Sequence, residues 1–413
     1  MTTSSILVIG GGFSGITAAL EAAELGHEVF LVEKNPFLGG RVAQLNKYFP
    51  KLCPPSCGLE IQFQRIKKNP NIKCLTLAEV TSLTGEAGNF EAQITIRPRF
   101  TAPQSIDFSQ LSKGLSKEVL SEFNLGLSKR KALYMDMPFA FPHRYVLKKD
   151  ELSAVDQAKV EENEYIHLEE EERTVTLQVG SVIYATGWQP YDVTGLSNLG
   201  AGTIPDCVSN MQMERLAAAG GPTNGRIVRP SDGRSSHRVV FVQCAGSRDE
   251  NHLPYCSYIC CMASLKQASY LRTQDPDCDI TIFYIDLRTP GRYDNFARRI
   301  LADEKIHAVK GKVAEVRQGD GGTGVWLTAE DILGGGKSTE YFDMVVLATG
   351  MQPSLAGEKL PECVQQDQEG FITSKSQNGI FAAGCAARPL DVMKSAQSAT
   401  CAAMKAIQTV RGR

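Results

Sequence analysis

The sequence lacks any uninterrupted apolar run of the roughly 18 residues that a membrane-spanning helix needs. It also lacks an excess of either charge: the formal net charge is -2 and the pI is about 6.4, which gives no electrostatic reason to bind nucleic acid. No basic segment precedes the first apolar run of MTTSSILVIGGG, so a signal peptide is not expected. These absences predict a cytoplasmic protein with no direct membrane span.

The chain is long enough for two or three domains, and it is rich in cysteine. It has 413 residues and 12 cysteines. A reducing compartment disfavours structural disulfides, so metal binding or redox chemistry explains these cysteines better.

A complete βαβ unit with a nucleotide-binding loop opens the chain. The apolar run Ile6–Ile9 predicts a buried strand, and the loop Gly10–Gly15 that follows reads G-x-G-x-x-G. Ile16–Leu25 predicts a helix, and a second strand over Glu28–Val32 ends at Glu33. This order is typical of dinucleotide-binding folds, whereas a glycine triplet alone is weak support.

Each loop position has a physical role. Gly10 permits the tight turn, Gly12 lets a pyrophosphate approach the backbone, and Gly15 lets helix and strand pack closely. The helix N-terminus attracts the phosphate charge, and Glu33 can bind ribose hydroxyls. Phe13 and Ser14 complete the predicted contact set. The competing interpretation is a glycine-rich turn without a ligand.

Later segments favour FAD over NAD. Gly39-Gly40-Arg41 follows Glu33, two strands (Ser181–Gly187 and Met344–Gly350) end in Ala-Thr-Gly, and Gly379–Cys385 reads GIFAAGC. This set resembles the thioredoxin and glutathione reductase superfamily, which implies an α/β fold with two Rossmann-like domains and a bound FAD. The further candidate cofactor contacts are Lys34, Gly40, Arg41, Thr186, Gly187, Gly350, Gly384, Cys385 and Val392.

The C-terminal motif departs from that superfamily at one position. The superfamily has Gly-Asp where this chain has Gly384-Cys385, which puts one hydrogen bond to FAD in doubt. The helix expected after Asp391 would direct its N-terminus at the flavin and stabilise negative charge on the reduced ring. The alternative for this helix is a docking role only.

The second βαβ unit lacks its glycine loop. A strand is expected at Arg238–Val242, but only Gly246 remains of a triplet in the segment Gln243–Arg248. Cysteine and arginine side chains there would obstruct a pyrophosphate, so NAD(P)H binding is not expected at this place.

Four cysteines occupy that position with the spacing C-x11-C-x3-C-C. Four thiolates from one short segment suit the corners of a [4Fe–4S] cluster. Zinc is the weaker alternative, because adjacent ligands do not fit the usual C-x2–4-C pairs. A third interpretation is four buried cysteines that act as small apolar residues. The residues are Cys244, Cys256, Cys260 and Cys261.

Several motifs together resemble the A subunits of heterodisulfide reductases, and more closely their short relatives in the quinone-interacting membrane-bound oxidoreductase (Qmo) complexes of sulfate reducers. The motifs are QCAGSRDE, YCSYICCMASLKQA, Glu214-Arg-Leu, Gly221-Pro-Thr-Asn-Gly, Val228–Gly233 and GIFAAGCAARP. The resemblance covers most of the chain outside about 100–170. It implies FAD, one [4Fe–4S] cluster on the four cysteines, and Lys266 near the flavin. The alternative for Lys266 is a solvated helix lysine.

The same resemblance implies a function and partners. The chain would pass electrons between a quinone-linked membrane partner and adenylylsulfate reductase in dissimilatory sulfate reduction. It would reach the membrane only through the other subunits of its complex. The large archaeal relatives carry ferredoxin-type C-x2-C-x2-C-x3-C runs, and this chain has none, so electron bifurcation is not carried over.

A second cysteine pair leaves three alternatives open. Cys53 and Cys57 precede GLEIQFQRIKKN, an expected amphipathic helix whose N-terminus would favour the Cys57 thiolate. They are a redox pair facing the flavin, ligands of a further metal centre, or structural residues. The first alternative supports a rival function, a free-standing FAD-dependent disulfide or polysulfide reductase. A structural flavoprotein scaffold is the non-enzymatic rival.

Domain boundaries follow from these motifs. We expect an FAD-binding domain over 1–200, a second Rossmann-like domain with the cluster over 201–345, and the C-terminal part of the FAD domain over 346–413. Residues 98–170 break the βαβ rhythm. They predict an exposed insertion with a charged helix at Lys148–Val160, which is either a docking surface or a solvated loop with no partner.

Overall fold

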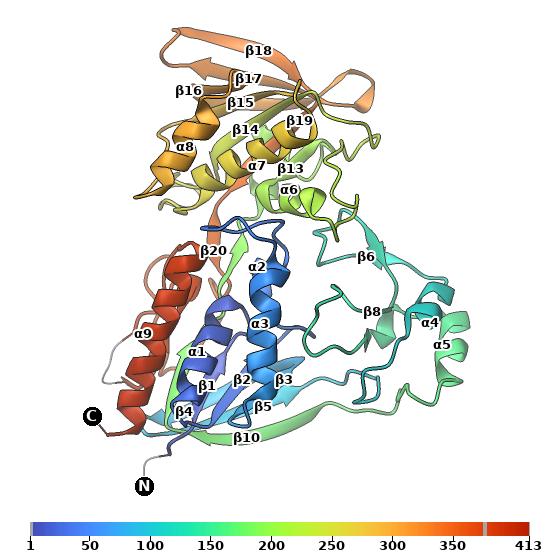
Figure 1. Ribbon diagram of the computed structural model, residues 1–413, viewed down its shortest axis with the longest axis vertical. Coiled ribbons are helices and arrows are strands. Elements are labelled where there is room, and N and C mark those ends of the chain that lie inside the picture. Colours follow the sequence, from blue (N-terminus) through green and yellow to red (C-terminus); the bar gives the residue numbers. More distant parts are fainter. Residues whose placement is uncertain (1–2, 375–377, 413) are drawn as a thin grey trace. The chain divides into compact units, whose positions relative to one another are not determined.

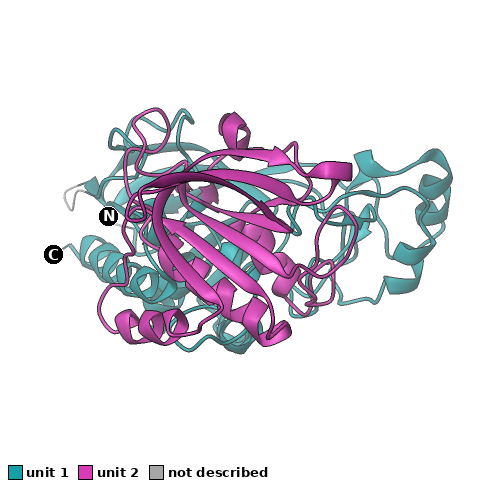
Figure 2. Ribbon diagram, turned by 90° about the horizontal axis from the view of Figure 1, so that it is seen from above, with its two compact units in different colours: residues 1–188, 353–413 teal, residues 189–352 magenta. Residues whose placement is uncertain are grey.

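The computed structural model describes residues 3–374 and 378–412. The chain forms two compact units, Met1–Trp188 with Pro353–Arg413 (unit 1) and Gln189–Gln352 (unit 2), shown in two colours in Figure 2. The sequence predicted that the chain passes between its domains near residues 200 and 345. In the structure the two boundaries lie in the short strands β12 (Trp188–Pro190) and β20 (Met351–Pro353), which pair with each other directly after the two Ala-Thr-Gly segments.

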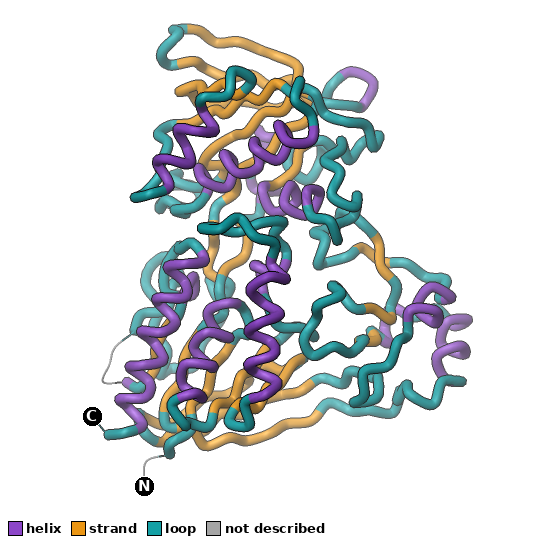
Figure 3. Tube along the Cα trace, viewed as in Figure 1, coloured by secondary structure: helices purple, strands orange, loops and turns teal. Residues whose placement is uncertain are grey.

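Unit 1 is built on a five-stranded parallel sheet with the order β21-β11-β1-β2-β3. Helices α1, α3 and α9 lie along one face of this sheet (Figure 1, Figure 3). The bounds are β1 Ile6–Ile9, α1 Phe13–Glu24, β2 Val29–Glu33, α2 Gly40–Ala43, α3 Pro55–Lys68, β3 Ile72–Thr76, β11 Ser181–Tyr184, β21 Ile380–Ala382 and α9 Val392–Val410.

The helical face packs through small residues. Alanines of α1 and α9 are fully buried against each other and against Ile6, Val8 and Leu31 of the sheet. Short side chains let the two helices approach closely. The opposite face of the sheet is covered by a three-stranded antiparallel sheet with the order β10-β5-β4, through a core that contains Leu7, Phe90 and Ile94. Its strands are β4 Ala78–Glu86, β5 Asn89–Ile96 and β10 Arg173–Val179.

The insertion lies between β5 and β10 and has a small core of its own. Phe108, Leu133 and Val160 are buried in one cluster with four other apolar residues. The expected helix over Lys148–Val160 is wrong in its bounds: a 3-10 turn at Lys149–Glu151 precedes α5, Ala154–Glu161. The Ser153 side chain caps α5 by accepting a hydrogen bond from the Asp156 N–H, which fixes its start. The other elements are α4 Ser109–Gly114, β6 Val119–Leu120, β7 Lys129–Arg130, β8 Leu133–Tyr134 and β9 Val146–Leu147.

A buried carboxylate stabilises this insertion. Asp156 accepts hydrogen bonds from the backbone N–H groups of Ser116 and Lys117 and from the Ser116 hydroxyl. Burial raises the pKa of Asp156, but these hydrogen bonds outweigh that effect and leave its pKa below the usual aspartate value. The insertion is therefore an ordered subdomain although its sequence is largely polar.

Unit 2 has a seven-stranded sheet with the order β13-β19-β14-β15-β16-β17-β18, in which the first five strands are parallel. Helices α6, α7 and α8 lie on one face of it (Figure 1). The bounds are β13 Cys207–Ser209, α6 Asn210–Ala217, β14 Arg238–Ala245, α7 Cys260–Gln274, β15 Asp279–Tyr284, α8 Tyr293–Leu301, β16 Ile306–Gln318, β17 Val325–Asp331, β18 Gly336–Phe342 and β19 Met344–Thr349.

Both units are thus α/β units with a parallel sheet, which confirms the predicted fold class. Over the described residues, no helix combines the length and the apolar character that crossing a bilayer requires.

Candidate functional site

The glycine loop of unit 1 forms a backbone cradle at the carboxyl end of β1. A Cβ on Gly15 would lie 1.8 Å from the Gly10 carbonyl oxygen, so only glycine permits this approach of helix to loop. Gly12 differs, because a Cβ there would meet nothing nearer than the Gly40 Cα at 3.8 Å. Gly12 is the N-cap of α1 and has no side chain to cap the first-turn N–H groups, which are therefore suited to a phosphate.

A second glycine segment closes the other side of the cradle. Gly39 donates its N–H to the Gly11 carbonyl at 2.8 Å, and Gly39 and Gly12 form a β-bridge. Gly39 and Gly40 both have positive φ, and a Cβ on Gly40 would lie 2.9 Å from the Gly12 Cα. The predicted juxtaposition of the two loops is present.

Glu33 ends β2 beside the same loop. Its carboxylate accepts hydrogen bonds from the Gly11 N–H at 2.6 Å and from the backbone and side-chain nitrogens of Asn35 at 2.8 and 2.7 Å. Burial raises the pKa of Glu33, and the hydrogen bonds, which lower it, only partly offset this effect. The group is held in place at the position where a ribose acceptor is expected.

Arg41, by contrast, extends to the end of unit 1. It donates to the Trp188 carbonyl at 3.3 Å and to the Gln44 side chain at 3.0 Å. Thr186 and Gly187 follow β11 just before this tryptophan, whereas Lys34 is exposed beyond β2. Gly350 lies in unit 2, where Ser247 and Leu253 leave no room for a Cβ, so it is not part of the glycine cradle.

The C-terminal motif joins the cradle through Ser14. A Cβ on Gly384 would lie 2.0 Å from the Ser14 hydroxyl, and the Gly384 N–H donates to Ser398 at 3.1 Å. Cys385 points its thiol into its own loop and donates to the Leu390 carbonyl at 3.4 Å. Burial raises the pKa of this thiol. The helix expected after Asp391 is present: the Asp391 side chain caps α9 by accepting a hydrogen bond from the Lys394 N–H, and Val392 is the first residue of the helix.

Cys53 and Cys57 lie near Tyr48. Both thiols contribute, after burial, to the raised pKa of the Tyr48 hydroxyl. The Tyr48 ring also lies 6.4 Å from the Phe13 ring of the glycine loop. The expectation that Cys57 precedes its helix is wrong: α3 begins at Pro55, so Cys57 lies within the first turn. Proline fits there because first-turn N–H groups need no partner. Both thiols are free.

The four cysteines of unit 2 lie together at the carboxyl end of β14 and the start of α7. Cys244 is in a left-handed backbone conformation (φ 57°) at a bulge of β14, and Arg248 and Tyr258 in the following loop share that conformation. Such conformations are strained for residues other than glycine and cluster at ligand sites. Cys260 and Cys261 are the first two residues of α7 and are buried.

These thiols affect one another's ionisation. Burial raises the pKa of Cys244 to about 11, and the neighbouring Cys261 and Cys256 add to the effect. Burial and the other three cysteines raise the pKa of Cys260 well above its ordinary value. Four thiolates at this place therefore need a compensating positive charge, which is what iron supplies in a cluster.

Two arginines supply part of that charge. Arg248 faces Cys244, and Arg288 faces Cys256. Both pair with Asp286, Arg288 at 2.9 Å, and Cys261 Sγ lies 3.8 Å from the Asp286 carbonyl. Gln243, next to Cys244, is buried, and neither its amide oxygen nor its nitrogen has a partner within the described chain. An unpaired amide donor of this kind suits a ligand with acceptor sulfurs.

Residues 3–374 and 378–412 contain no group of three or more His, Cys, Asp or Glu side chains arranged to hold a metal ion, and the four cysteines are no exception.

Lys266 is the seventh residue of α7 and is not a solvated lysine. Its side chain is 5% exposed, and its Nζ lies 3.1 Å from Glu214 Oε1 on α6. Gln267 donates to the same Glu214 oxygen at 2.7 Å and to the Asn210 carbonyl. Sequence reasoning missed the role of Glu214, although the Glu214-Arg-Leu motif contained it. It also missed Tyr48, Asp286 and Arg288, because Asp286 and Arg288 are distant in the sequence from the cysteines that they face and nothing singled out Tyr48.

Comparisons with known proteins agree with this geometry. The profile of the family FAD dependent oxidoreductase matches residues 5–49, which hold the glycine cradle. The chain is 35% identical to an iron-sulfur A subunit of the CoB--CoM heterodisulfide reductase of Methanopyrus kandleri, over 98% of this chain and 64% of that protein. It is 33% identical to the A subunit of the ferredoxin/F(420)H(2)-dependent CoB-CoM heterodisulfide reductase of Methanosarcina acetivorans, over 96% and 52%. The chain thus spans about half to two thirds of the length of these relatives.

Solved structures share the fold. The thioredoxin reductase of T. acidophilum superposes with a TM-score of 0.53 at 16% identity, covering 98% of this chain and 97% of that one. The bacillithiol disulfide reductase of Bacillus cereus gives 0.53 at 13% identity, covering 99% of each chain. Over almost its whole length the chain is therefore similar to the heterodisulfide reductase A subunits, and its fold is that of the thioredoxin-reductase-like, FAD-dependent oxidoreductases.

Proposed function

We propose that this chain is the flavin- and cluster-bearing electron-transfer subunit of a heterodisulfide-reductase-like complex. Unit 1 would hold one FAD, and unit 2 would hold one [4Fe–4S] cluster on Cys244, Cys256, Cys260 and Cys261. The observation that carries the proposal is the cysteine loop itself. It stands where the second βαβ unit would need glycines, its backbone is strained, and Arg248 and Arg288 face Cys244 and Cys256.

The chain's residues would hold each group in a defined way. The first-turn N–H groups of α1, the cradle of Gly12 and Gly40, and Glu33 would bind the phosphates and ribose of FAD. Arg248 and Arg288 would offset the negative charge of the cluster. When bound, FAD exchanges electrons in pairs and the cluster singly, which suits a protein that links a two-electron carrier to a one-electron chain.

Partners follow from the family resemblance of the motifs. We propose that the complex is quinone-linked at the membrane, that it exchanges electrons with adenylylsulfate reductase in dissimilatory sulfate reduction, and that this chain reaches the membrane only through its partners. The absence of a second glycine loop supports a protein donor or acceptor over a soluble nicotinamide.

The test is anaerobic purification followed by iron, sulfide and flavin analysis and EPR. The expected result is about four irons, four sulfides and one FAD per chain, since one cube binds four thiolates. Less than about one iron per chain would contradict the cluster assignment. Turnover of a disulfide or polysulfide by the isolated chain, lost in Cys57→Ser, would favour the rival reductase.

A further inference from the structure

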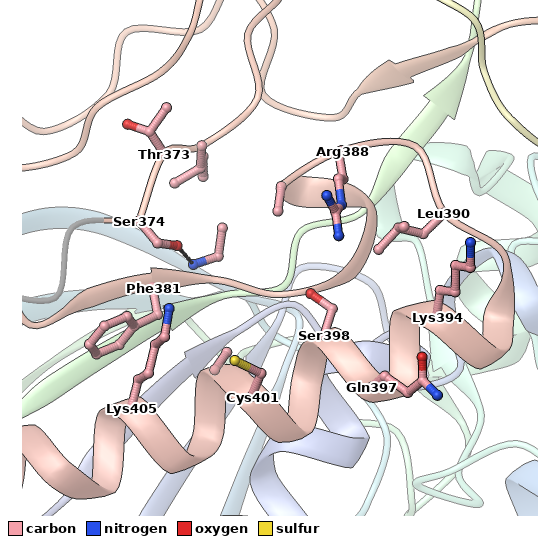
Figure 4. A pocket seen from close by; sticks show the side chains of 14 residues that line it. Thr373, Ser374, Phe381, Arg388, Leu390, Lys394, Gln397, Ser398, Cys401 and Lys405 are labelled. Atoms are coloured by element: carbon pink, nitrogen blue, oxygen red, sulfur yellow. Dashed lines mark hydrogen bonds between the residues drawn. The ribbon is translucent and has the colours of Figure 1, made fainter.

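A cavity of about 780 Å³ lies in unit 1 beside helix α9, and the proposed electron transfer does not use it. It is bounded by one face of α9, by the edge strand β21 and by the segment around Ile372 and Thr373 (Figure 4). Its volume is in the range of pockets that bind small organic molecules. All of its lining residues belong to unit 1.

The cavity is lined by three cations. Arg388 reaches toward α9 from the loop that follows β21, and Lys394 and Lys405 rise from α9 on either side of it (Figure 4). None of the described residues that line the cavity is acidic. Across the described chain, neither the Arg388 nor the Lys405 side chain forms an ion pair. Arg388 and Lys405, two cations without a carboxylate partner among the described residues, favour an anion between them.

The floor of the cavity is apolar. Phe381 of β21, Ile372 and Leu390 are buried and line it, together with alanines. The Ser398 hydroxyl points upward from α9 (Figure 4) and accepts a hydrogen bond from the Gly384 N–H at 3.1 Å. A ligand that fits this surface has an apolar body and a compact, strongly negative group. Arginine and lysine together favour a phosphate, because it offers several acceptor oxygens and more than one charge.

We propose that this cavity is a binding site for a small phosphate monoester with an apolar or aromatic body. Arg388 and Lys405 would bind the phosphate, and Phe381 and Leu390 would contact the body. The site lies along α9, whose capped N-terminus belongs to the same loop as Gly384 and Cys385. Occupancy would therefore restrain the loop that joins the glycine cradle.

Cys401 provides a built-in reporter. It lines the cavity between Ser398 and Lys405 on the same face of α9, and it is exposed and free. Cys57 is also exposed and free, but it belongs to α3 and does not line the cavity. The rate at which iodoacetamide modifies each thiol can be read by mass spectrometry of the two peptides, in the full chain with its flavin bound.

Phenyl phosphate is the probe. It is expected to slow modification of Cys401 in a saturable way and to leave Cys57 unchanged, whereas neutral benzyl alcohol has no effect. Inorganic phosphate is expected to protect less than phenyl phosphate, because it lacks the apolar body. Arg388→Gln or Lys405→Gln should weaken the protection about tenfold, the size expected for one charge-assisted hydrogen bond. Arg411→Gln, just beyond α9 and outside the cavity, is the matched control and should change nothing.

Three results would overturn the proposal. The first is that phenyl phosphate does not slow the modification of Cys401. The cations would then be better explained as a binding site for an acidic protein segment. The second is equal protection by benzyl alcohol, which would make the cavity a purely apolar groove. The third is full protection in the Arg388→Gln/Lys405→Gln double variant. An unchanged flavin absorbance spectrum in each variant shows that unit 1 is intact.

Discussion

Lys266 Nζ lies 3.1 Å from Glu214 Oε1, and both side chains are almost fully buried in unit 2. The pair joins α7, which begins with two of the four clustered cysteines, to α6. A buried ion pair contributes little net stability compared with apolar residues, but loss of one partner leaves a charge in a dry environment. The pair therefore holds α7 against α6, because separating the two side chains would leave buried charges without a partner.

The Lys266–Glu214 pair gives the first prediction. Lys266→Met should destabilise unit 2 by about 3 kcal/mol, because the Glu214 carboxylate loses its counter-charge. Lys266→Met combined with Glu214→Gln should recover much of that loss. Urea unfolding followed by circular dichroism gives the comparison. The pairing would be contradicted if the double variant lost at least as much unfolding free energy as the Lys266→Met and Glu214→Gln single variants lose together.

The glycine cradle gives the second. Gly12→Ala should fold normally, because the nearest atom to the new Cβ is 3.8 Å away, yet it should weaken FAD binding about tenfold or more by blocking the phosphate. Gly114→Ala is the control, since its Cβ also meets open space but lies in the insertion. Flavin content after gel filtration is the measurement. Normal flavin in Gly12→Ala would place the phosphates elsewhere.

The third prediction concerns Arg288, the cation that faces Cys256. Arg288→Gln removes a cation that faces Cys256, so adding an electron to the cluster becomes harder. The reduction potential should fall by about 50 mV, roughly a tenfold change for one electron. Arg317→Gln removes an exposed, carboxylate-paired arginine of the same unit and should leave the potential unchanged. EPR-monitored redox titration decides between these outcomes.

The thiol environment gives a pH dependence in the metal-free protein. Burial raises the pKa of Cys244 to about 11, from an ordinary value of 9.0. A raised folded-state pKa means that stability is lost as pH rises from about 9 toward 11, because the unfolded chain releases its proton first. Iodoacetamide modification of Cys244 should also keep accelerating through about pH 10. In urea-unfolded chain the rate should level off near about pH 9, and an early plateau in the folded chain would refute the shift.

The sequence predicted the elements that follow simple periodicity. Ile6–Ile9 forms β1 with the predicted bounds, and α9 follows Asp391 as predicted. Boundaries failed where side chains decide them: Pro55 starts α3 earlier than the hydrophobic pattern suggested, and Ser153 starts α5 later. These caps depend on single hydrogen bonds or on proline geometry, which periodicity does not register.

The sequence predicted which residue types form the candidate site, but not which side chains contact each other. Cysteine spacing identified the four thiols, because they come from one segment. Glu214 beside Lys266, and Asp286 beside Arg248, are contacts between segments far apart in the chain. The core of the insertion was missed for the same reason, since Phe108, Leu133 and Val160 are widely spaced.

The iron content of cysteine variants tests the central claim most directly. Cys256→Ser is compared with Cys278→Ser, which replaces a buried cysteine that precedes β15 and bonds to the Ser236 carbonyl. Both proteins are purified anaerobically and assayed for iron, sulfide and flavin. We predict that Cys256→Ser loses most of its iron and its reduced-cluster EPR signal while it keeps FAD, and that Cys278→Ser keeps all three. Equal iron in the two variants would contradict the cluster assignment.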